Sequence, residues 1–319
     1  MSSSKRRWAS TILVLLAFYP SASCLSKKTS AKQCALSVVY ESVGPQGRPC
    51  TQEEVYARAR KGGAFEQNQL GLAALFTSSS GGSSGEALHW LSEAAKLNYA
   101  PAEVNLGLLY LHGWGTKPNY ALAIHYFHLA ADQGSPEADY NLGVIYLLGR
   151  GVKQDYVEAL RLFLKSASTR NPPAESAVGF MYDLGLAVEK NSETAASWYG
   201  KAAEAGYPEA EANLAQMYFH GSGVPRDETR AFFWFRQAAL QGNVDACVNL
   251  GFMYAKGWGT TRDAKLAYLW LTAASLAGFH EQDSMITALR QELSTEQVKK
   301  SQEEAERLSS RTRLKGLLE

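Results

Sequence analysis

The sequence predicts an all-α protein, a right-handed α/α superhelical solenoid of about six helix-turn-helix repeats of 36 residues each. Two observations lead to this fold class. A Leu-Gly-x-x-Tyr motif recurs at a constant interval of 36 residues, beginning at Leu106, Leu142, Val178, Leu214 and Leu250. A glycine also follows each tyrosine of the motif after three residues. A fixed period of this length is typical of helix pairs that bury their apolar faces only by stacking on their neighbours.

The first helix of each repeat is predicted from the apolar positions around the motif. An alanine lies four residues before the motif and the tyrosine lies four residues after its start, as in Ala102, Leu106 and Tyr110. This spacing places all three side chains on one helix face, which we expect to be core. The glycines after the motif are expected to end the helix in a left-handed C-cap; they are Gly113, Gly149, Gly185, Gly221 and Gly257.

The loop after the first helix carries a second glycine in four of the five repeats. Its members are Gly115, Gly151, Gly223 and Gly259. Ala187 takes this place in the remaining repeat, so its loop is expected to differ slightly.

The second helix of each repeat begins with a polar residue suited to cap it. Asparagine or aspartate recurs at one position, as Asn119, Asp155, Asn191, Asp227 and Asp263. These side chains accept hydrogen bonds from the free backbone N–H groups of a first helical turn. Alanine and aromatic residues follow at intervals of three and four, which predicts a second apolar stripe. Gly134, Gly206, Gly242 and Gly278 are expected to close this helix.

These motifs resemble Sel1-like repeats, which are relatives of tetratricopeptide repeats. The matching patterns are Ala-x-x-Asn-Leu-Gly-x-x-Tyr, Gly-x-Gly-Val/Thr and Ala-Ala-x-x-Gly, over roughly residues 64–282. The resemblance implies a solenoid used as an adaptor or scaffold, exported in bacteria or resident in the lumen of the endoplasmic reticulum in eukaryotes. Cysteine-rich members of the family fasten each repeat with a disulfide. This chain lacks those cysteines, so its repeats are expected to depend on packing.

The chain divides into four predicted segments. Residues 1–24 form a secretory signal, because the basic residues Lys5 to Arg7 precede a short apolar run. Residues 25–50 have no clear element, and residues 51–282 form the solenoid, opened by a lone helix over 51–61. A Ser/Gly-rich connection is expected at 78–85. Residues 283–319 are expected to form C-terminal capping helices, the last of them polar and begun by a capping box at residues 294–297.

The cysteines bear on where the protein acts. Export is expected, to the periplasm or the extracellular space in a bacterium, or to the endoplasmic reticulum lumen or beyond in a eukaryote. Cys34 and Cys50 could then form a disulfide. Cys24 follows Ser23 at the end of the signal, so lipidation of its thiol is an alternative to plain cleavage. Such an anchor is the one membrane association that the sequence suggests.

No catalytic, cofactor or metal site is predicted. Residues 81–85 match Gly-x-Ser-x-Gly but lie between two helices in a Ser/Gly linker, where a nucleophile elbow does not fit. His125 and His128 could share a helix face, but neither recurs in its column, which favours an exposed face. The net charge of +1 gives no reason to expect nucleic acid as a partner.

A partner-binding surface is predicted where the first helices vary. Core positions are nearly constant, whereas neighbouring positions hold Tyr140, Phe180 and Phe252 in different repeats. An asparagine column lies beside them, formed by Asn105, Asn141, Asn213 and Asn249. In tetratricopeptide relatives such asparagines hold a bound peptide. The alternative is that they tie one repeat's backbone to the next.

These observations predict a non-catalytic adaptor or scaffold that binds a protein or peptide. One alternative is a cell-envelope hydrolase acting on β-lactam or peptidoglycan-linked substrates. Another is a lipid-anchored envelope factor whose repeats recruit an enzyme, which differs from the first reading at Cys24.

Overall fold

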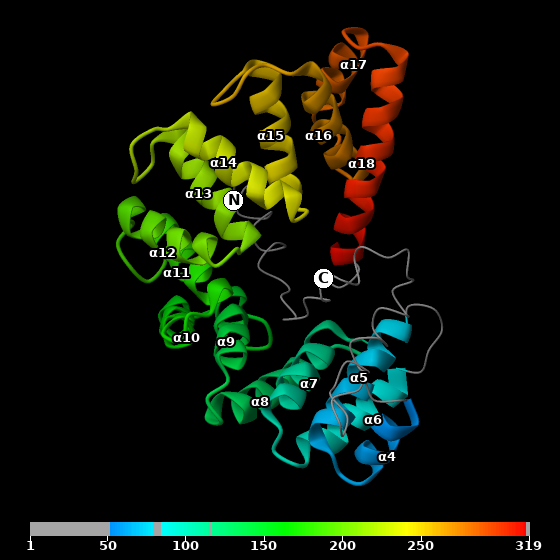
Figure 1. Ribbon diagram of the computed structural model, residues 1–319. Coiled ribbons are helices and arrows are strands. Elements are labelled where there is room, and N and C mark those ends of the chain that lie inside the picture. The colour runs from blue at the N-terminus through cyan, green and yellow to red at the C-terminus, as the bar shows by residue number, and fades with distance from the viewer. Residues whose placement is uncertain (1–51, 79–83, 115, 317–319) are drawn as a thin grey trace, which may run out of the picture. The chain divides into compact units, whose positions relative to one another are not determined.

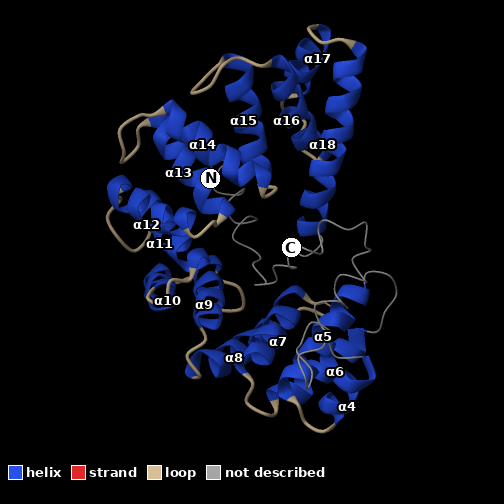
Figure 2. Cartoon of the chain, in the orientation of Figure 1, coloured by secondary structure: helices blue, strands red, loops and turns tan. Residues whose placement is uncertain are grey.

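A computed structural model of the chain describes residues 52–78, 84–114 and 116–316. These residues form helices and loops, with no strand among them (Figure 1, Figure 2). The predicted signal, the segment 25–50, and Cys24, Cys34 and Cys50 lie outside the described residues. The all-α solenoid of stacked helix pairs predicted from the 36-residue period is confirmed.

The chain divides into two compact units on either side of residue 166. We call the described residues up to 166 the N-terminal unit and those from 167 the C-terminal unit. The helices of the N-terminal unit are α4 (Gln52–Arg60), α5 (Ala64–Ser78), α6 (Ser84–Ala95), α7 (Ala100–His112), α8 (Tyr120–Asp132), α9 (Pro136–Leu148) and α10 (Tyr156–Ala167). Those of the C-terminal unit are α11 (Pro172–Leu184), α12 (Ser192–Glu204), α13 (Pro208–His220), α14 (Glu228–Leu240), α15 (Val244–Lys256), α16 (Ala264–Leu276), α17 (Asp283–Gln291) and α18 (Thr295–Gly316).

Within each unit, a helix pair packs internally and against the next pair. In the C-terminal unit α11 packs on α12, α12 on α13, α13 on α14, α14 on α15 and α15 on α16. The contact inside a pair is close because the motif glycine has no side chain. A Cβ built on Gly107 would come within 2.5 Å of the ring of Phe127. Phe127 is fully buried, so the glycine and the aromatic residue together bring α7 and α8 into contact.

The predicted helix ends are confirmed. The first helices of the five repeats end at glycines with φ from 67° at Gly149 to 74° at Gly257. The second helices begin at the predicted caps: the backbone N–H of Leu122 donates to Asn119 Oδ1 at 3.1 Å, and that of Arg230 donates to Asp227 Oδ1 at 2.9 Å. The caps act through neighbouring residues alone, so the ends of the helices, and with them the 36-residue period, do not depend on long-range packing.

The loop that contains Ala187 was expected to differ from the other loops, but its backbone conformation is the same. Ala187 has φ 60°, close to the 72°, 70° and 64° of Gly151, Gly223 and Gly259 at the equivalent position. The prediction was wrong because the C-cap glycine before the loop and the N-cap after it keep the same geometry in every repeat, and Ala187 adopts it. A non-glycine residue in the left-handed region carries steric strain of about 1–2 kcal/mol.

Replacing Ala187 with glycine is therefore expected to stabilise the protein. Relief of the strain exceeds the entropy that glycine adds to the unfolded chain, leaving a net gain of about 0.5–1 kcal/mol. Urea denaturation followed by circular dichroism measures this change. An unchanged or lower unfolding free energy for Ala187→Gly would contradict the strain assigned to this loop.

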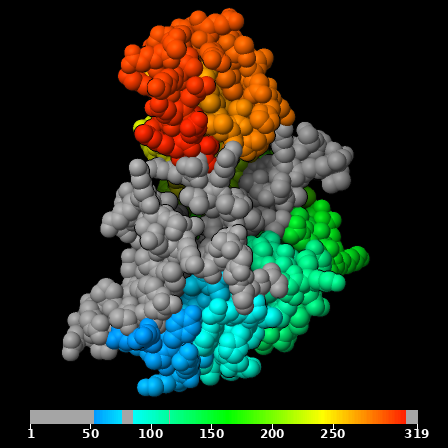
Figure 3. All heavy atoms as spheres, turned by 90° about the vertical axis from the view of Figure 1, so that its right-hand side faces the viewer, coloured from blue at the N-terminus to red at the C-terminus, as the bar shows by residue number. Residues whose placement is uncertain are grey.

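Two helices, α17 and α18, form the C-terminal cap where capping helices were expected. The predicted capping box is confirmed, since the N–H of Ser294 donates to Gln297 Oε1 at 2.9 Å and the N–H of Gln297 donates to Ser294 Oγ at 3.3 Å. The helix it begins, α18, is polar in composition as expected, and it also buries one face on α16. Ser301 and Ala305 are fully buried there, and Figure 3 shows α18 in red against the orange helices. Small residues permit this close packing without an apolar run.

The Ser/Gly connection is shorter than predicted. Helix α6 already begins at Ser84, so Ser84 and Gly85 belong to a helix, and residues 79–83 lie outside the described part. Helix α4 stands where the lone opening helix was expected, with Ala59 fully buried.

Candidate functional site

The four asparagines of the predicted binding column have different surroundings. Asn105 is 8% exposed, and its Nδ2 donates to Asn68 Oδ1 at 2.8 Å. Asn141 and Asn249 are partly exposed, and each donates at 2.8 Å to the carbonyl oxygen four residues earlier in its own helix. Asn213 is 8% exposed, and its buried Nδ2 has no acceptor within the described chain. Two of the four side chains therefore bond within their own helix.

The aromatic residues predicted beside this column are distributed over both units. Tyr140, in the N-terminal unit, is 6% exposed and its ring centroid lies 5.7 Å from that of Phe163. Phe180 and Phe252 belong to the C-terminal unit; Phe180 is 8% exposed, and Phe252 is partly buried against the core cluster that contains Tyr268 and Leu271.

The histidines of α8 and the free cysteine Cys247 are other residues that could carry chemistry. His125 and His128 are exposed on α8, and no cluster of three or more His, Cys, Asp or Glu suited to a metal occurs in the described residues. Cys247 is a buried free thiol whose pKa is raised to about 12 by its burial. It is therefore protonated near neutral pH and is a weak nucleophile. Across the described helices, none has the length and apolar composition of a membrane span.

His112 at the end of α7 is held in its neutral form. Burial, with a smaller contribution from the positive charge of Arg150, lowers the pKa of its imidazole to about 4. The ring stacks on Trp114, with 4.7 Å between the ring centroids. Because the folded-state pKa lies below the ordinary value of about 6.5, the unfolded chain takes up the proton more readily, and stability is lost as the pH falls from about 6.5 towards 4.

The change His112→Leu is expected to remove this pH dependence, because leucine does not titrate. Leucine should also fit the site, since Leu148 and Leu184 occupy the equivalent position in the next two repeats. Between pH 7 and pH 5, the free energy of unfolding of wild type is expected to fall by about 1–2 kcal/mol more than that of the variant. This figure allows for the solvent-exposed part of the ring. Urea denaturation of both proteins at the two pH values measures the difference. Parallel losses would show that His112 is not the responsible group.

A column of buried acidic residues was not predicted from the sequence. Its members, from 1% to 6% exposed, are Glu103, Asp139, Glu175 and Glu211. Three bind a residue near the end of the second helix of the same repeat: Gln133 donates to Glu103 at 2.6 Å, Lys165 to Asp139 at 2.8 Å and Gln241 to Glu211 at 2.9 Å. Burial raises the pKa of the Glu103 and Glu175 carboxyl groups. The column therefore stabilises the contact between the two helices of a repeat. Its recurrence every 36 residues is the sequence signal that could have predicted it.

The exposed variable surface of the repeats lies on the second helices. We define the outer face as four positions, spaced by four, three and four residues, on the second helices α8, α10, α12 and α14. Its members are Ala121, His125, His128 and Asp132 on α8, Val157, Arg161, Leu164 and Ser168 on or after α10, Glu193, Ser197, Gly200 and Glu204 on α12, and Thr229, Phe233, Arg236 and Leu240 on α14. All are exposed except Gly200, which is partly exposed. No residue type recurs at any of the four positions among these helices.

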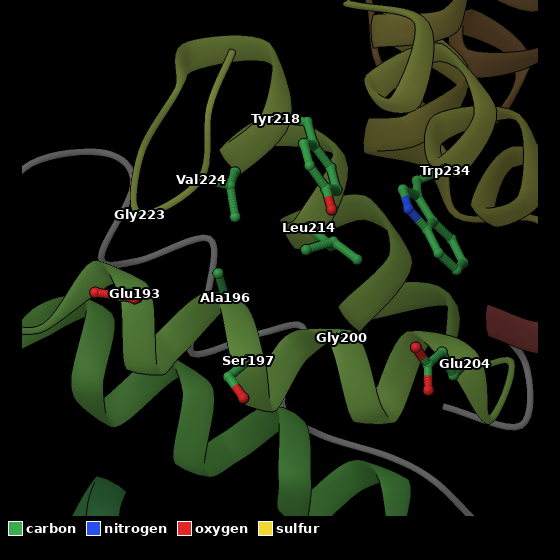
Figure 4. A pocket seen from close by; sticks show the side chains of 10 residues that line it. All are labelled: Glu193, Ala196, Ser197, Gly200, Glu204, Leu214, Tyr218, Gly223, Val224 and Trp234. Atoms are coloured by element: carbon green, nitrogen blue, oxygen red, sulfur yellow. The ribbon is translucent and has the colours of Figure 1, made fainter. Parts of the chain in front are cut away.

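A pocket of about 370 Å³ opens on this face within the C-terminal unit. Helix α12 forms one wall, α13 and the loop after it form a second, and Trp234 of α14 closes one end (Figure 4). The lining residues are Glu193, Ala196, Ser197, Gly200 and Glu204 from α12, Leu214 and Tyr218 from α13, Gly223 and Val224 from the loop, and Trp234.

The pocket exists because α12 lacks two large side chains. At the position of Ala196 the other repeats carry Ile124, Leu160, Phe232 and Tyr268, and at that of Gly200 they carry His128, Leu164, Arg236 and Thr272. In the next repeat Phe232 packs edge-on against Tyr254, with ring centroids 5.2 Å apart. Tyr218 is the counterpart of Tyr254 but faces alanine. A Cβ on Gly200 would meet no atom within 4 Å, so the space is not filled by a neighbour.

The lining of the pocket is aromatic and acidic. Glu193 and Glu204 supply two carboxylates, neither with a hydrogen bond or ion pair to the described residues, and none of the ten lining residues is basic. The Tyr218 hydroxyl accepts a hydrogen bond from Arg230 at 3.3 Å. Arg230 is itself paired with Asp227 at 3.4 Å, which balances its charge.

Comparisons with known proteins agree with the repeat boundaries. The model of the Sel1 repeat matches residues 67–99, 100–135, 136–168, 172–207, 208–243 and 244–279. A Sel1 repeat protein from Oxalobacter formigenes has a solved structure with 29% identity and a TM-score of 0.67, over 81% of this chain and 76% of that one. Immunity protein Pa5087 from Pseudomonas aeruginosa is 22% identical with a TM-score of 0.48, over 70% of this chain and 82% of that one. No curated protein matches the chain.

Proposed function

The chain belongs to the Sel1 repeat family, and from this we propose that it is a non-catalytic scaffold that binds a protein partner. The observation that supports the proposal is the outer face of the second helices. The core positions repeat almost unchanged, whereas the outer-face positions of α8, α10, α12 and α14 differ from helix to helix and all but Gly200 are exposed. Repeat arrays of this kind use one core to present many different surfaces.

Exposed apolar residues mark where a partner would make contact. Val157 is 69% exposed and Leu164 39% on α10, and Phe233 is 49% exposed and Leu240 44% on α14. An arginine lies between the two apolar residues on each helix. Apolar side chains that gather on a surface with arginine are typical of protein interfaces, whereas single exposed ones are common everywhere.

Affinity capture with a matched pair of baits tests the proposal. The full chain is compared with the double variant Val157→Ser, Leu164→Ser and with the control Lys265→Ser, which changes the counterpart of Val157 in the last repeat. We expect mass spectrometry to identify one or a few proteins that wild type and control retain and the double variant loses. Retention of nothing above the level of the bare resin would contradict the scaffold proposal.

The asparagine column is a second proposed contact surface, for an extended peptide. Asn141 and Asn249 suit this role because they are partly exposed and their side-chain oxygens accept no hydrogen bond from the described residues. The variant Asn141→Ala, Asn249→Ala should lose the captured partner at an unchanged melting temperature. A lower melting temperature with intact binding would assign these residues to stability.

We also propose that the chain is exported and that its first 24 residues are removed. Mass spectrometry of the mature N-terminus separates the alternatives: plain cleavage near Cys24 leaves an unmodified terminus, whereas an acylated Cys24 identifies a lipid-anchored protein. The same sample, digested without reduction, reports whether Cys34 and Cys50 are joined.

A further inference from the structure

We infer that the pocket between α12, α13 and α14 receives a positively charged side chain, arginine or lysine, of the protein partner. The inference rests on the proposed function, because it assigns the chemistry of one contact on the outer face. It adds what the scaffold proposal leaves open, namely which residue type the partner presents at this place.

The charge of the pocket favours a cation. Glu193 and Glu204 carry two negative charges without a counter-ion among the described residues, and the nearby Arg230 is already paired with Asp227. The equivalent positions of α14 carry Thr229 and Leu240, and those of α10 carry Val157 and Ser168. The acidic pair is therefore particular to this repeat and does not follow from the repeat architecture.

The aromatic walls suit the same ligand. Trp234 lies at the end of the pocket where Glu204 stands, and Tyr218 lies between the two ends (Figure 4). A guanidinium or ammonium group against an indole face gains cation–π attraction, and the carboxylate of Glu204 neutralises its charge. Leu214, Val224 and Ala196 provide apolar contact for the aliphatic part of an arginine or lysine side chain.

The length of the site suggests how the partner lies. Glu193 and Glu204 are eleven residues apart on α12, about 16 Å along the helix axis. An extended peptide covers that distance with about five residues. A partner segment with one basic residue at Trp234 and Glu204, and a second about five positions away at Glu193, would pair with both carboxylates.

Fluorine NMR of the full chain labelled with 5-fluorotryptophan tests the inference directly. The chain has seven tryptophans, and the signal of Trp234 is assigned with Trp234→Phe. The probes are arginine amide and citrulline amide, which share nearly the same shape but differ in the charge of the side chain. We expect arginine amide to shift the Trp234 signal saturably and citrulline amide to leave it nearly unchanged.

Three variants locate the effect. Ala196→Phe places in the pocket the residue that fills the equivalent space in the next repeat, and should abolish the shift. Glu204→Gln should weaken the binding of arginine amide by about 2–5-fold. Glu303→Gln, an exposed site on α18 that makes the same charge change, should have no effect. Equal responses to the two amides, or a response that survives both Ala196→Phe and Glu204→Gln, would overturn the inference.

Failure of this inference is distinguishable from failure of the proposed function. A partner that is captured equally well by wild type and Ala196→Phe would leave the scaffold proposal intact and refute the role of the pocket. Absence of any specifically captured partner bears on the scaffold proposal alone, because the arginine amide titration needs no partner.

Discussion

Truncation of Phe235 to alanine is expected to lower the free energy of unfolding by about 3–5 kcal/mol. The Phe235 side chain is 2% exposed and packs in the core cluster with Ala215, Ala238 and Leu250. Removing the ring leaves a cavity between α13, α14 and α15, which alanine-rich walls cannot collapse to fill. Urea denaturation followed by circular dichroism measures the loss, and hydrogen exchange should place it in the repeats next to α14.

Phe233→Ala is the matched control for this prediction. Phe233 lies two residues earlier on the same helix but is 49% exposed on the outer face. The same truncation there should change the unfolding free energy by less than about 0.5 kcal/mol. Similar losses for the two variants would contradict the assignment of one face of α14 to the core and the other to the surface.

Gly223→Ala is expected to cost about 2–4 kcal/mol. Gly223 has φ 70°, where any side chain is strained, and a Cβ there would lie 2.2 Å from both the carbonyl carbon and the carbonyl oxygen of Ser192. The clash is with backbone at the start of α12, so no side-chain rotation relieves it. The loop and the preceding second helix would have to separate.

Gly206→Ala separates the backbone strain at positive φ from the clash with Ser192, which together cause the loss at Gly223. Gly206 has φ 80°, but a Cβ there meets nothing within 4 Å. Its substitution should therefore cost only the backbone strain, about 0.5–1 kcal/mol after the gain in unfolded-state entropy. If Gly223→Ala were no more harmful than Gly206→Ala in urea denaturation, the close approach of loop and helix would not contribute to stability.

The fold was predictable because each helix end has a local cause that recurs. Caps such as Asn119 and Gly149 act through their own side chain or backbone, without reference to distant residues, so the sequence carries the complete signal. The same is true of the capping box at Ser294. A period of 36 residues repeated without a slip then leaves stacked helix pairs as the arrangement that buries both apolar stripes.

The features of the fold that were not predicted concern residues whose conformation or burial depends on their surroundings. Ala187 adopts the left-handed backbone that alanine disfavours, because the caps on both sides of the loop require it. The buried face of α18 consists largely of small residues, Ser301 and Ala305 among them, which in the sequence resemble a solvated helix. Neither outcome follows from the preferences of the residue itself.

The candidate site was harder to predict than the fold. The sequence predicts a binding surface where the first helices vary, whereas the outer face lies on the second helices and its pocket lies between α12, α13 and α14. The signal for the pocket was nevertheless present, since Ala196 and Gly200 are the smallest residues of their columns. What the sequence could not provide is the position of Tyr218 and Trp234 around the missing side chains, because this depends on how three helices pack.

The scaffold function proposed above requires that the outer face of the second helices binds a protein partner. Isothermal titration calorimetry of the purified partner against wild type, Lys265→Ser and the double variant Val157→Ser, Leu164→Ser tests it most directly. We expect equal affinity for wild type and Lys265→Ser, and an affinity about tenfold weaker for the double variant. Equal affinity for all three proteins would contradict it, and would show that the exposed apolar residues of α10 take no part in binding.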